Sequence, residues 1–246
     1  MKAIILAGGS GSRLHPLTIK KNKHLLELHG RPIICYALEK LSNAGFYEVM
    51  IITSTKHVEE FIKVLGHKNI FELSNGKKMK ITYGIQNNPD GIAHGLYIAK
   101  DYVGEDNCVL YLGDNIFEDD ISKYVKNFNG GAKIFLKPVF DPQRFGIATL
   151  GDNNKVIAIE EKPLNPKSNL AVTGLYFYDN TVFEKIANQS KSDRGEYEIT
   201  DINNKYIAED ALEFVVLQKD WFDIGTIESL YLASAYMRNK YENYKK

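Results

Sequence analysis

Residues 2–14 read KAIILAGGSGSRL, an apolar run followed directly by a glycine-rich stretch that contains an arginine. The run from Lys2 to Ala7 is short and apolar and predicts a buried β-strand. Gly8, Gly9 and Gly11 then allow backbone N–H groups to approach an anion at the carboxyl end of that strand, where open α/β sheets bind their ligands. The stretch therefore predicts an α/β fold with a phosphate-binding turn after its first strand.

The glycine-rich turn differs from two well-known phosphate-binding loops. It is not closed by the Gly-Lys-Ser/Thr sequence of a P-loop, and Leu14 stands where a dinucleotide-binding fingerprint has its third glycine. A nicotinamide-dependent dehydrogenase is therefore disfavoured. Arg13 can bind a phosphate through two hydrogen bonds and Lys23 acts as a mobile point charge, so both are candidate phosphate ligands. Lys20 and Lys21 are expected to be solvated surface residues.

The first half of the chain continues the alternation of strand and helix that starts at residue 2. β-branched apolar runs alternate with segments whose apolar residues recur at helical spacing, a pattern typical of a parallel sheet covered on both faces. We therefore expect a Rossmann-like, mixed and mainly parallel sheet flanked by helices. The predicted strands are Lys2 to Ala7, Val49 to Thr53, Ile81 to Ile85 and Val109 to Leu112, and the predicted helices are Ile33 to Asn43, Lys56 to Leu65 and Gly91 to Asp101.

The second half shows a weaker alternation and is expected to be α+β, with few helices. Its polar, turn-rich segments are too short to be a linker between domains. We expect one domain over residues 1–246, with halves of about 1–115 and 116–246. The predicted strands are Ile134 to Val139, Gly146 to Leu150, Val156 to Glu161, Ala171 to Tyr178 and Phe214 to Leu217, followed by a helix from Thr226 to Tyr244 and a fraying charged end, Lys240 to Lys246.

Composition excludes several classes of protein and of partner. Of the 246 residues, 44% are hydrophobic and 25% are charged, which is typical of a globular protein. Lys+Arg and Asp+Glu both number 31, so neither nucleic acid nor an anionic membrane is expected as a partner. Cys35 and Cys108 lie in apolar contexts without C-x-x-C spacing and are expected to be buried, reduced thiols. No apolar run reaches the ~18 residues of a membrane span, and we expect a cytoplasmic location.

Ordered motifs along the chain resemble those of the sugar nucleotidyltransferases, the sugar-nucleotide pyrophosphorylases. Within this family the chain is similar to the glucose-1-phosphate thymidylyltransferases, in a short form without the C-terminal helical extension of longer relatives. Many motifs in one order are far more specific than any single motif. They extend over residues 1 to about 235 and are LAGGSGSRL (6–14), PLT (16–18), KHLL (23–26), QNNPDGIA (86–93), LGDNIF (112–117), RFG (144–146), EEKP (160–163), AVTGLYFYD (171–179), RGEYEITDIN (194–203) and WFDIGT (221–226).

The resemblance implies a fold and a reaction. The fold is the nucleotide-diphospho-sugar transferase fold, with nucleotide bound by the first half and sugar phosphate by the second. The reaction condenses dTTP with α-D-glucose 1-phosphate to dTDP-glucose and pyrophosphate, by in-line attack on the α-phosphate, for deoxysugar or surface-polysaccharide synthesis. The alternatives are a family member that uses UTP or another hexose 1-phosphate, and a catalytically silent nucleotide-sugar sensor. The oligomeric state stays open, a homo-oligomer included.

Two aspartates are the candidate metal ligands. Asp114 follows the apolar strand that ends at Leu112, and from the residues alone it could equally cap a turn. Asp223 lies among apolar neighbours, where a carboxylate needs a partner, or where it could begin the last helix. Mg²⁺ takes one or two protein carboxylates beside phosphate oxygens. The resemblance implies that Asp114 and Asp223 bind this ion.

The resemblance also implies which residues meet the substrates. Both reactants are anions, so alignment and charge neutralisation dominate the catalysis, no general base is needed, and the histidines are not expected to be catalytic. Gln86 offers a donor and an acceptor to the edge of a pyrimidine. The implied catalytic residues are Arg13, Lys23, Asp114 and Lys162. The implied nucleotide-binding residues are Gly8, Gly9, Gly11, Ser12, Arg13, Lys23, Gln86 and Gly91, and the implied sugar-binding residues are Asn115, Gly146, Glu161, Lys162 and Val172.

Three residues depart from the pattern of the family. Glu27 stands where relatives usually have proline, His94 replaces a common glutamine, and Phe145 replaces a frequent tyrosine. His94 could alter the wall that faces the nucleoside, and Phe145 removes a hydroxyl near the sugar. None of the three removes a proposed charge. A silent sensor would be expected to lack Arg13 or a metal aspartate, and the chain has them all.

Overall fold

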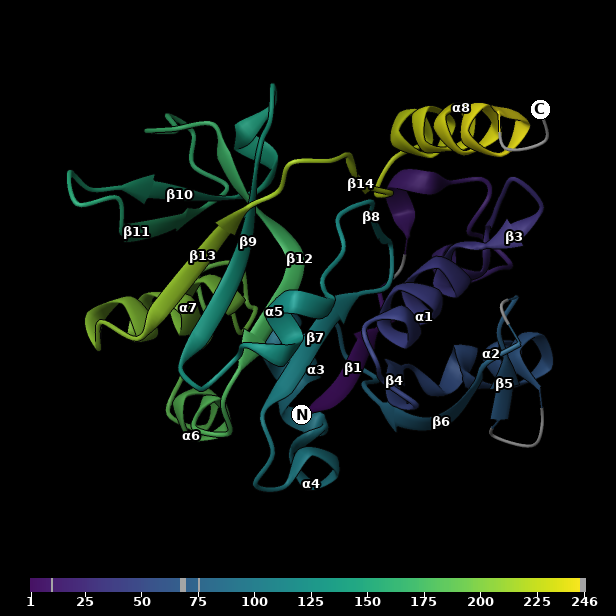
Figure 1. Cartoon of the computed structure of the whole chain (residues 1–246), viewed down its shortest axis with the longest axis horizontal. Helices are drawn as coiled ribbons and strands as arrows, with labels where there is room; N and C mark the ends of the chain where they lie inside the picture. Colours follow the sequence, from purple (N-terminus) through teal and green to yellow (C-terminus); the bar gives the residue numbers. More distant parts are fainter. Residues whose placement is uncertain (10, 67–69, 75, 244–246) are drawn as a thin grey trace.

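A mixed β-sheet runs through both halves of the chain in the computed structural model, which describes residues 1–9, 11–66, 70–74 and 76–243 (Figure 1). In these residues the sheet has ten strands in the order β11-β10-β12-β7-β1-β4-β6-β5, and β9 and β13 continue it beside β12. Helices cover both faces. The structure therefore confirms the predicted fold class, a mixed sheet flanked by helices.

The central strands of the sheet run parallel. β1 lies between β4 and β7, and β6 pairs with the other edge of β4, while the short β5 is antiparallel to β6. Alternate side chains of β1 enter different layers, Ala3 and Ile5 on one face and Ile4 on the other. The four strands predicted in this part are confirmed to within a few residues, whereas the short β5 was not predicted. The strands are β1 (Lys2–Leu6), β4 (Glu48–Thr53), β5 (Ile70–Glu72), β6 (Lys78–Ile85) and β7 (Cys108–Leu112).

The strands of the second half are mostly antiparallel. β12 pairs with β10 near its start, at Ala171, and with β7 near its end, through Leu175 to Tyr178. The neighbour of β12 therefore changes from β10 to β7 along the strand. β9 pairs with the opposite edge of β12, and β13 is parallel to β9. The predicted strands are again confirmed. They are β9 (Ala132–Pro138), β10 (Gly146–Leu150), β11 (Val156–Glu161), β12 (Leu170–Tyr178) and β13 (Leu212–Val216).

Two short antiparallel strand pairs lie outside the main sheet, and the sequence predicted neither pair. β8 (Asn115–Phe117) is antiparallel to β14 (Trp221–Asp223), although about a hundred residues separate the two strands along the chain. β2 (Glu27–Leu28) pairs with β3 (Arg31–Pro32). Strands of two or three residues carry too little periodicity to be recognised before their partners are known.

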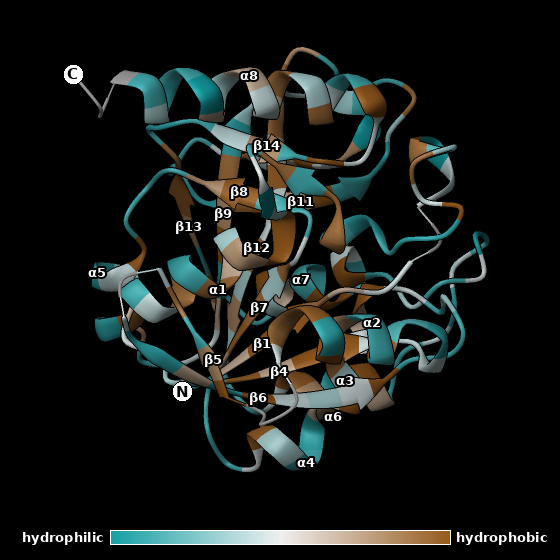
Figure 2. Ribbon diagram, turned by 90° about the vertical axis from the view of Figure 1, so that its right-hand side faces the viewer, coloured by the Kyte–Doolittle hydropathy of each residue, from teal (hydrophilic) through white to brown (hydrophobic). Residues whose placement is uncertain are grey.

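Helices pack against both faces of the sheet through two apolar layers. Figure 2 shows the strands as the hydrophobic interior, with hydrophilic residues on the outer helices. α1, α2 and α5 share one layer with Phe135 and Phe177, and α3, α4, α6 and α7 share the other with Tyr178. The helices are α1 (Ile33–Asn43), α2 (Thr55–Leu65), α3 (Ile92–Ile98), α4 (Lys100–Val103), α5 (Ser122–Lys126), α6 (Val182–Ala187), α7 (Ile199–Ala208) and α8 (Ile227–Asn243).

The helix predictions need two corrections. The helix expected over Gly91 to Asp101 divides into α3 and α4, because the N–H of Ala99 bonds to Leu96 in a tighter turn. The second half also has more helices than expected, since α5, α6 and α7 were not predicted. The helix at the C-terminal end is confirmed as α8, while residues 244–246 of the expected fraying end lie outside the described part.

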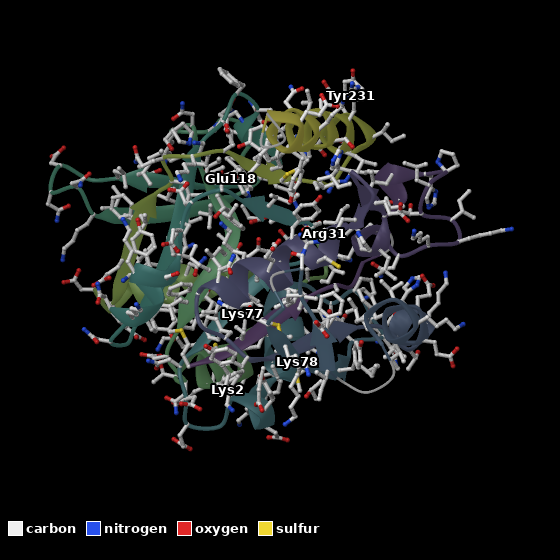
Figure 3. The ribbon with its side chains drawn as sticks, turned by 45° about the vertical axis from the view of Figure 1, so that its right-hand side comes forward. Lys2, Arg31, Lys77, Lys78, Glu118 and Tyr231 are labelled. Carbon is white, nitrogen blue, oxygen red and sulfur yellow. The ribbon has the colours of Figure 1, made fainter. Side chains whose placement is uncertain are left out.

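The C-terminal helix α8 packs across the N-terminal segment and the β8–β14 pair. A third apolar cluster joins Leu28, Ile33, Ile224 and Met237 beneath it. Lys240 of α8 donates to Glu118, and Tyr231 points outward from the opposite side of the helix (Figure 3). Both cysteines are buried and free, as expected. None of the helices in the described ranges is long and apolar enough to cross a membrane.

Candidate active site

A cavity of about 380 Å³ opens at the carboxyl ends of the central parallel strands, between the two halves of the chain. Glycine-rich turns, loops and strands from both halves line it. The structure brings together every predicted site residue except Gly11 and Ser12, which do not line the cavity. The predicted residues that do are Gly8, Gly9, Arg13, Lys23, Gln86, Gly91, Asp114, Asn115, Gly146, Glu161, Lys162, Val172 and Asp223.

The glycine-rich turn leaves β1 and presents backbone to the cavity. Gly9 has a positive φ of 92°, and the carbonyl of Ala7 before it accepts hydrogen bonds from Asn22 Nδ2 and Thr53 Oγ1, both at 3.2 Å. Gly11 also has a positive φ, and its carbonyl accepts from Thr18 Oγ1 at 2.7 Å. These bonds hold the turn in place. Gly11 therefore shapes the loop that carries the next residues, rather than facing the cavity itself.

Asp114 and Lys23 form a buried ion pair directly after β7. The side chain of Asp114 is 11% exposed, and its Oδ2 accepts from Lys23 Nζ. Burial alone would raise the pKa of Asp114, but the positive charge of Lys23 and the hydrogen bonds from Lys23 and Asn115 together outweigh it and hold the pKa below the usual range. Gly113 has no room for a Cβ, which would lie 2.9 Å from His24 Cδ2. Asp114 is therefore ionised and fixed at the strand end.

His24 lies beside this ion pair and is electrically neutral. Its Nδ1 donates to Asn22 Oδ1 at 2.7 Å. Burial lowers the pKa of His24 to about 3, and the nearby charge of Lys23 adds to the effect. The ring therefore packs against the turn and orients it, and the expectation that the histidines are not catalytic stays a prediction.

Asp223 lies beside Asp114 in the folded chain, although more than a hundred residues separate the two in the sequence. The pairing of β14 with β8 sets Asp223 opposite Asn115, and Ile224 N donates to the carbonyl of Asp114 at 2.9 Å. Burial and, after it, the negative charge of Asp114 raise the pKa of Asp223 to about 6. A partial counter-charge comes from Lys23, from Arg144, whose Nη2 lies 3.4 Å from Asp223 Oδ2, and from Arg13.

Asp223 is thus a buried carboxylate without a full counter-charge. It lies beside Asp114, and basic side chains line the same cavity. A site for a divalent cation with bound phosphates needs this combination of carboxylates and positive charges. Groups of three or more His, Cys, Asp or Glu side chains able to hold a metal do not occur among the described residues. Two carboxylates suit Mg²⁺, which completes its coordination with water and phosphate oxygens.

The second half contributes a carboxylate and a lysine at the end of β11. Glu161 Oε2 accepts from Thr200 Oγ1 at 2.7 Å, and Oε1 accepts from Arg194 Nη1 at 3.1 Å. Lys162 follows with a φ of 45°, a left-handed conformation that is uncommon for a residue with a side chain. Its N–H is fixed by the carbonyl of Phe145 at 3.0 Å. Such backbone conformations are often found at functional sites.

Gln86 and Gly91 form part of the cavity wall that the first half of the chain contributes. Gln86 follows β6, and its Nε2 lies 3.1 Å from the carbonyl oxygen of Gly91 and 3.1 Å from His94 Nδ1. Gly91 has a φ of 101°, and a Cβ there would lie 2.5 Å from the carbonyl oxygen of Tyr197. Glycine is therefore required at this position by both conformation and space.

Three of the four hydrogen-bonding positions of the Asn115 amide are used within the protein. Its Oδ1 accepts from Trp221 Nε1 at 2.7 Å and from Gly174 N at 3.1 Å, while its Nδ2 donates to Asp114 Oδ1 at 2.9 Å. Gly174 has no room for a Cβ beside the amide. Asn115 therefore joins β7, β12 and β14 behind the cavity, and its sugar-binding role stays a prediction.

Arg144 and Trp221 are among the cavity-lining residues that sequence reasoning missed. Arg144 lines the cavity and contacts both Asp141, at 2.7 Å, and Asp223. Trp221 also lines it and packs against Phe145 with ring centroids 5.4 Å apart. Both lie inside motifs that carried the family resemblance, so their motif membership was the available signal.

Comparison with known proteins places these features in a family. The model of the nucleotidyl transferase family matches residues 2–240. The chain is 40% identical to a glucose-1-phosphate thymidylyltransferase of Neisseria meningitidis, over 97% of this chain and 83% of that protein, and 40% identical to one of Mycolicibacterium smegmatis, over 97% and 82%.

Solved structures show the same similarity. A Bacillus anthracis protein, provisionally assigned as a glucose-1-phosphate thymidylyltransferase and crystallised with sucrose, superposes with a TM-score of 0.88 at 45% identity, over 97% of this chain and 95% of that one. A UDP-glucose pyrophosphorylase bound to UDP-glucose has a TM-score of 0.82 at 20% identity, over 97% and 98% of the two chains. At that identity the second similarity shows the fold alone.

Proposed function

The chain belongs to the nucleotidyl transferase family, and we propose that it joins dTTP to α-D-glucose 1-phosphate, giving dTDP-glucose and pyrophosphate. The observation that carries the proposal is the convergence in one cavity of Arg13, Lys23 and Lys162 with two aspartates. Two phosphate compounds repel each other in water, and a site for their reaction must gather positive charge where they meet. The names of the relatives supply the choice of nucleotide and sugar.

The nucleotide is proposed to lie over the glycine-rich turn. The backbone of Gly8 and Gly9 approaches the nucleoside and its phosphates, and Arg13 and Lys23 hold the triphosphate. Gln86 and Gly91 face the base. Arg13 and Lys23 also stabilise the charge that builds on the leaving pyrophosphate. Ser12 and Gly11 support this arrangement from behind the turn.

The sugar phosphate is proposed to bind in the second half. Glu161, held by Thr200 and Arg194, accepts hydrogen bonds from sugar hydroxyls, beside the backbone of Gly146 and Val172. Lys162 holds the phosphate of the sugar phosphate and orients one of the phosphate oxygens toward the α-phosphorus of the nucleotide. That oxygen forms the new P–O bond as the bond to the β-phosphate oxygen breaks, and pyrophosphate leaves with the electron pair. The attacking oxygen is already ionised, so no side chain has to remove a proton.

Asp114 and Asp223 are proposed to hold Mg²⁺. When bound, the ion would neutralise phosphate charge and align the reacting groups. Asp114 is kept ionised by Lys23, so it is ready to bind a cation. Asp223 is ionised less readily in its buried position, and a cation would favour its charged form. The residues present therefore fit the ion that the resemblance implies.

A pyrophosphate-release assay tests the proposal. dTTP, UTP, CTP, ATP and GTP are each combined with glucose, galactose and mannose 1-phosphate, with Mg²⁺ and with chelator. We expect the highest kcat/KM for dTTP with glucose 1-phosphate and no turnover with chelator. Highest turnover with UTP or another hexose would replace the substrate assignment. Binding of dTTP without turnover of any pair would favour a nucleotide-sugar sensor.

A further inference from the structure

The amide of Gln86 has one orientation that its neighbours allow. The carbonyl oxygen of Gly91 can only accept a hydrogen bond, so the Gln86 atom 3.1 Å away must be the amide nitrogen. This carbonyl cannot move freely, because Asp90 O accepts from Tyr197 N at 2.8 Å and Ala93 N donates to Tyr197 O at 3.2 Å. The backbone on both sides of Gly91 is therefore fastened to residue 197.

The second hydrogen of the same amide nitrogen is directed at His94 Nδ1, also 3.1 Å away. Both amide hydrogens are then engaged within the protein, and Gln86 Oε1 is what remains for a ligand. Gly8 and Gly95 lie beside this oxygen, at positions where a Cβ would come within 3.7 and 3.1 Å of it. Gln86 thus offers the cavity an acceptor without a donor. Thymine and uracil carry a matching N–H at N3, whereas cytosine has a lone pair there.

His94 can play this part in one protonation state alone. Nδ1 accepts a hydrogen bond when it carries no proton, which places the ring hydrogen on Nε2. A charged ring has N–H groups at both positions, and Nδ1–H would then face the amide hydrogens of Gln86. The charged and titratable groups recorded around the ring are Asp90, whose Oδ2 lies 3.9 Å from Nδ1, Lys191, which pairs with the other oxygen of Asp90, and Tyr197, whose ring centroid is 6.0 Å away.

We propose that His94 is a positioning residue that holds the Gln86 amide with its oxygen toward the base, so that discrimination between nucleotides depends on pH. The proposal rests on the proposed function for the identity of the nucleotide. Histidine is the side chain that most often changes charge between about pH 5 and pH 8. When the ring of His94 is charged, the acceptor for the second amide hydrogen is lost and the amide is no longer fixed: in its present orientation a hydrogen faces Nδ1–H, and reversed it sets Oε1 against the carbonyl oxygen of Gly91. Preference for an N3–H base falls accordingly.

Equilibrium binding separates this inference from the question of turnover. The dissociation constants of dTTP and CTP are measured by calorimetry with chelator present, at about pH 8.5 and about pH 6. The two nucleotides share the triphosphate, so titration of the phosphates cancels in the ratio of their constants. His94→Leu removes the acceptor. His94→Gln keeps an acceptor oxygen that does not titrate, and His29→Gln, whose exposed ring stacks on Tyr241 and does not line the cavity, is the matched control.

We expect wild type and His29→Gln to prefer dTTP at the higher pH and to lose part of that preference at the lower pH, at most about tenfold, the equivalent of one net hydrogen bond. His94→Gln should keep the preference at both pH values, and His94→Leu should have the reduced preference at both. An unchanged ratio in His94→Leu would overturn the proposal, as would a wild-type pH response in His94→Gln. Because these are binding constants, a protein that binds dTTP but fails to turn over glucose 1-phosphate would contradict the proposed function and still decide the role of His94.

Discussion

The two halves of the chain, proposed to bind the nucleotide (about 1–115, the nucleotide half) and the sugar phosphate (about 116–246, the sugar half), build their parts of the site in different ways. In the nucleotide half, Gly8, Gln86 and Asp114 each follow within two residues the end of a parallel strand, so the topology of the sheet brings them to one edge. In the sugar half, Glu161 ends an antiparallel strand and Asp223 comes from a three-residue strand paired with β8. The first arrangement follows from a general rule of α/β sheets, whereas the second depends on contacts that exist only in the folded chain.

The two aspartates show the same contrast in their electrostatics. Asp114 has a lysine of its own half against it, and this keeps its pKa low in spite of burial. Asp223 faces Asp114 and has counter-charges farther away, so its pKa rises to about 6. In the nucleotide half, the charge of Asp114 is therefore balanced by Lys23 even when no ligand is bound. Asp223 of the sugar half adds a second negative charge beside it, which a bound cation would balance.

The largest expected effect is on turnover, and it should be the same for both aspartates. Asp114→Asn and Asp223→Asn should each lower kcat by at least about a thousandfold, because each removes a ligand of the ion that offsets phosphate charge. Asp152→Asn, in an exposed turn, is the control and should match wild type. Near-normal turnover in either site variant would show that its half supplies no metal ligand.

The second effect tests whether the nucleotide half depends on its contact with the sugar half. Gly91→Ala introduces a Cβ at positive φ and 2.5 Å from the backbone of Tyr197, so we expect a loss of about 2 to 4 kcal/mol of stability and about a hundredfold weaker dTTP binding. Gly45→Ala is the matched control, because Gly45 has nearly the same φ, of 99°, and its Cβ would have no atom within 4 Å. It should lower stability by about 1 to 3 kcal/mol and leave the dTTP affinity unchanged. Equal dTTP affinities in the two variants would remove Gly91 from the nucleotide site.

The halves also differ in how far the sequence alone reveals them. The apolar periodicity predicted α1 with its observed bounds, and it predicted the parallel strands closely, because buried strands and amphipathic helices leave strong local patterns. It missed α7, whose sequence ITDINNKYIA has adjacent asparagines, and it missed the β8–β14 pair. Those elements form because tertiary packing favours them, which local propensity does not record.

Site residues could be predicted from the sequence where a residue with a suitable functional group also stands at a suitable position in a motif. Lys23, Asp114 and Gln86 combine a strand-end or glycine-loop position with a suitable functional group. The place of Asp223 beside Asp114 came from resemblance, since spacing cannot reveal a pairing over more than a hundred residues. The missed Arg144 has no local signal of function except its motif, because its partner Asp223 is distant in the sequence.

The third effect concerns stability without metal and has opposite signs for the two aspartates. The folded-state pKa of Asp223 lies above its unfolded value of 3.8, so its folded form favours the proton and stability falls as the pH rises through about 6. Metal-free Asp223→Asn should therefore be more stable than wild type by about 2 kcal/mol above pH 7. Asp114→Asn should be less stable by about 3 kcal/mol, because Lys23 loses its buried partner.

Urea unfolding with chelator, at several pH values, measures both differences. The advantage of Asp223→Asn should shrink toward pH 4, where Asp223 is protonated in wild type. Titration of His24 is common to wild type and Asp223→Asn and cancels in that difference, whereas Asp114→Asn removes a charge that raises the pKa of His24. Stability changes of the same sign in the two variants would contradict the assignment of opposite electrostatic roles.

The smallest effect compares one buried hydroxyl in each half. Thr200 Oγ1 donates to the carboxylate of Glu161, and Thr53 Oγ1 donates to the carbonyl of Ala7, which also accepts from Asn22. Thr200→Val should raise KM for glucose 1-phosphate about tenfold and leave KM for dTTP unchanged, because a hydrogen bond to a charged group orients the carboxylate that meets the sugar. Thr53→Val should cost about 1 kcal/mol of stability and change neither KM, since Ala7 keeps its other donor. A rise in the dTTP KM of Thr200→Val would mean that Glu161 serves both substrates, and the division of the cavity into a nucleotide half and a sugar half would then have to be redrawn at β11.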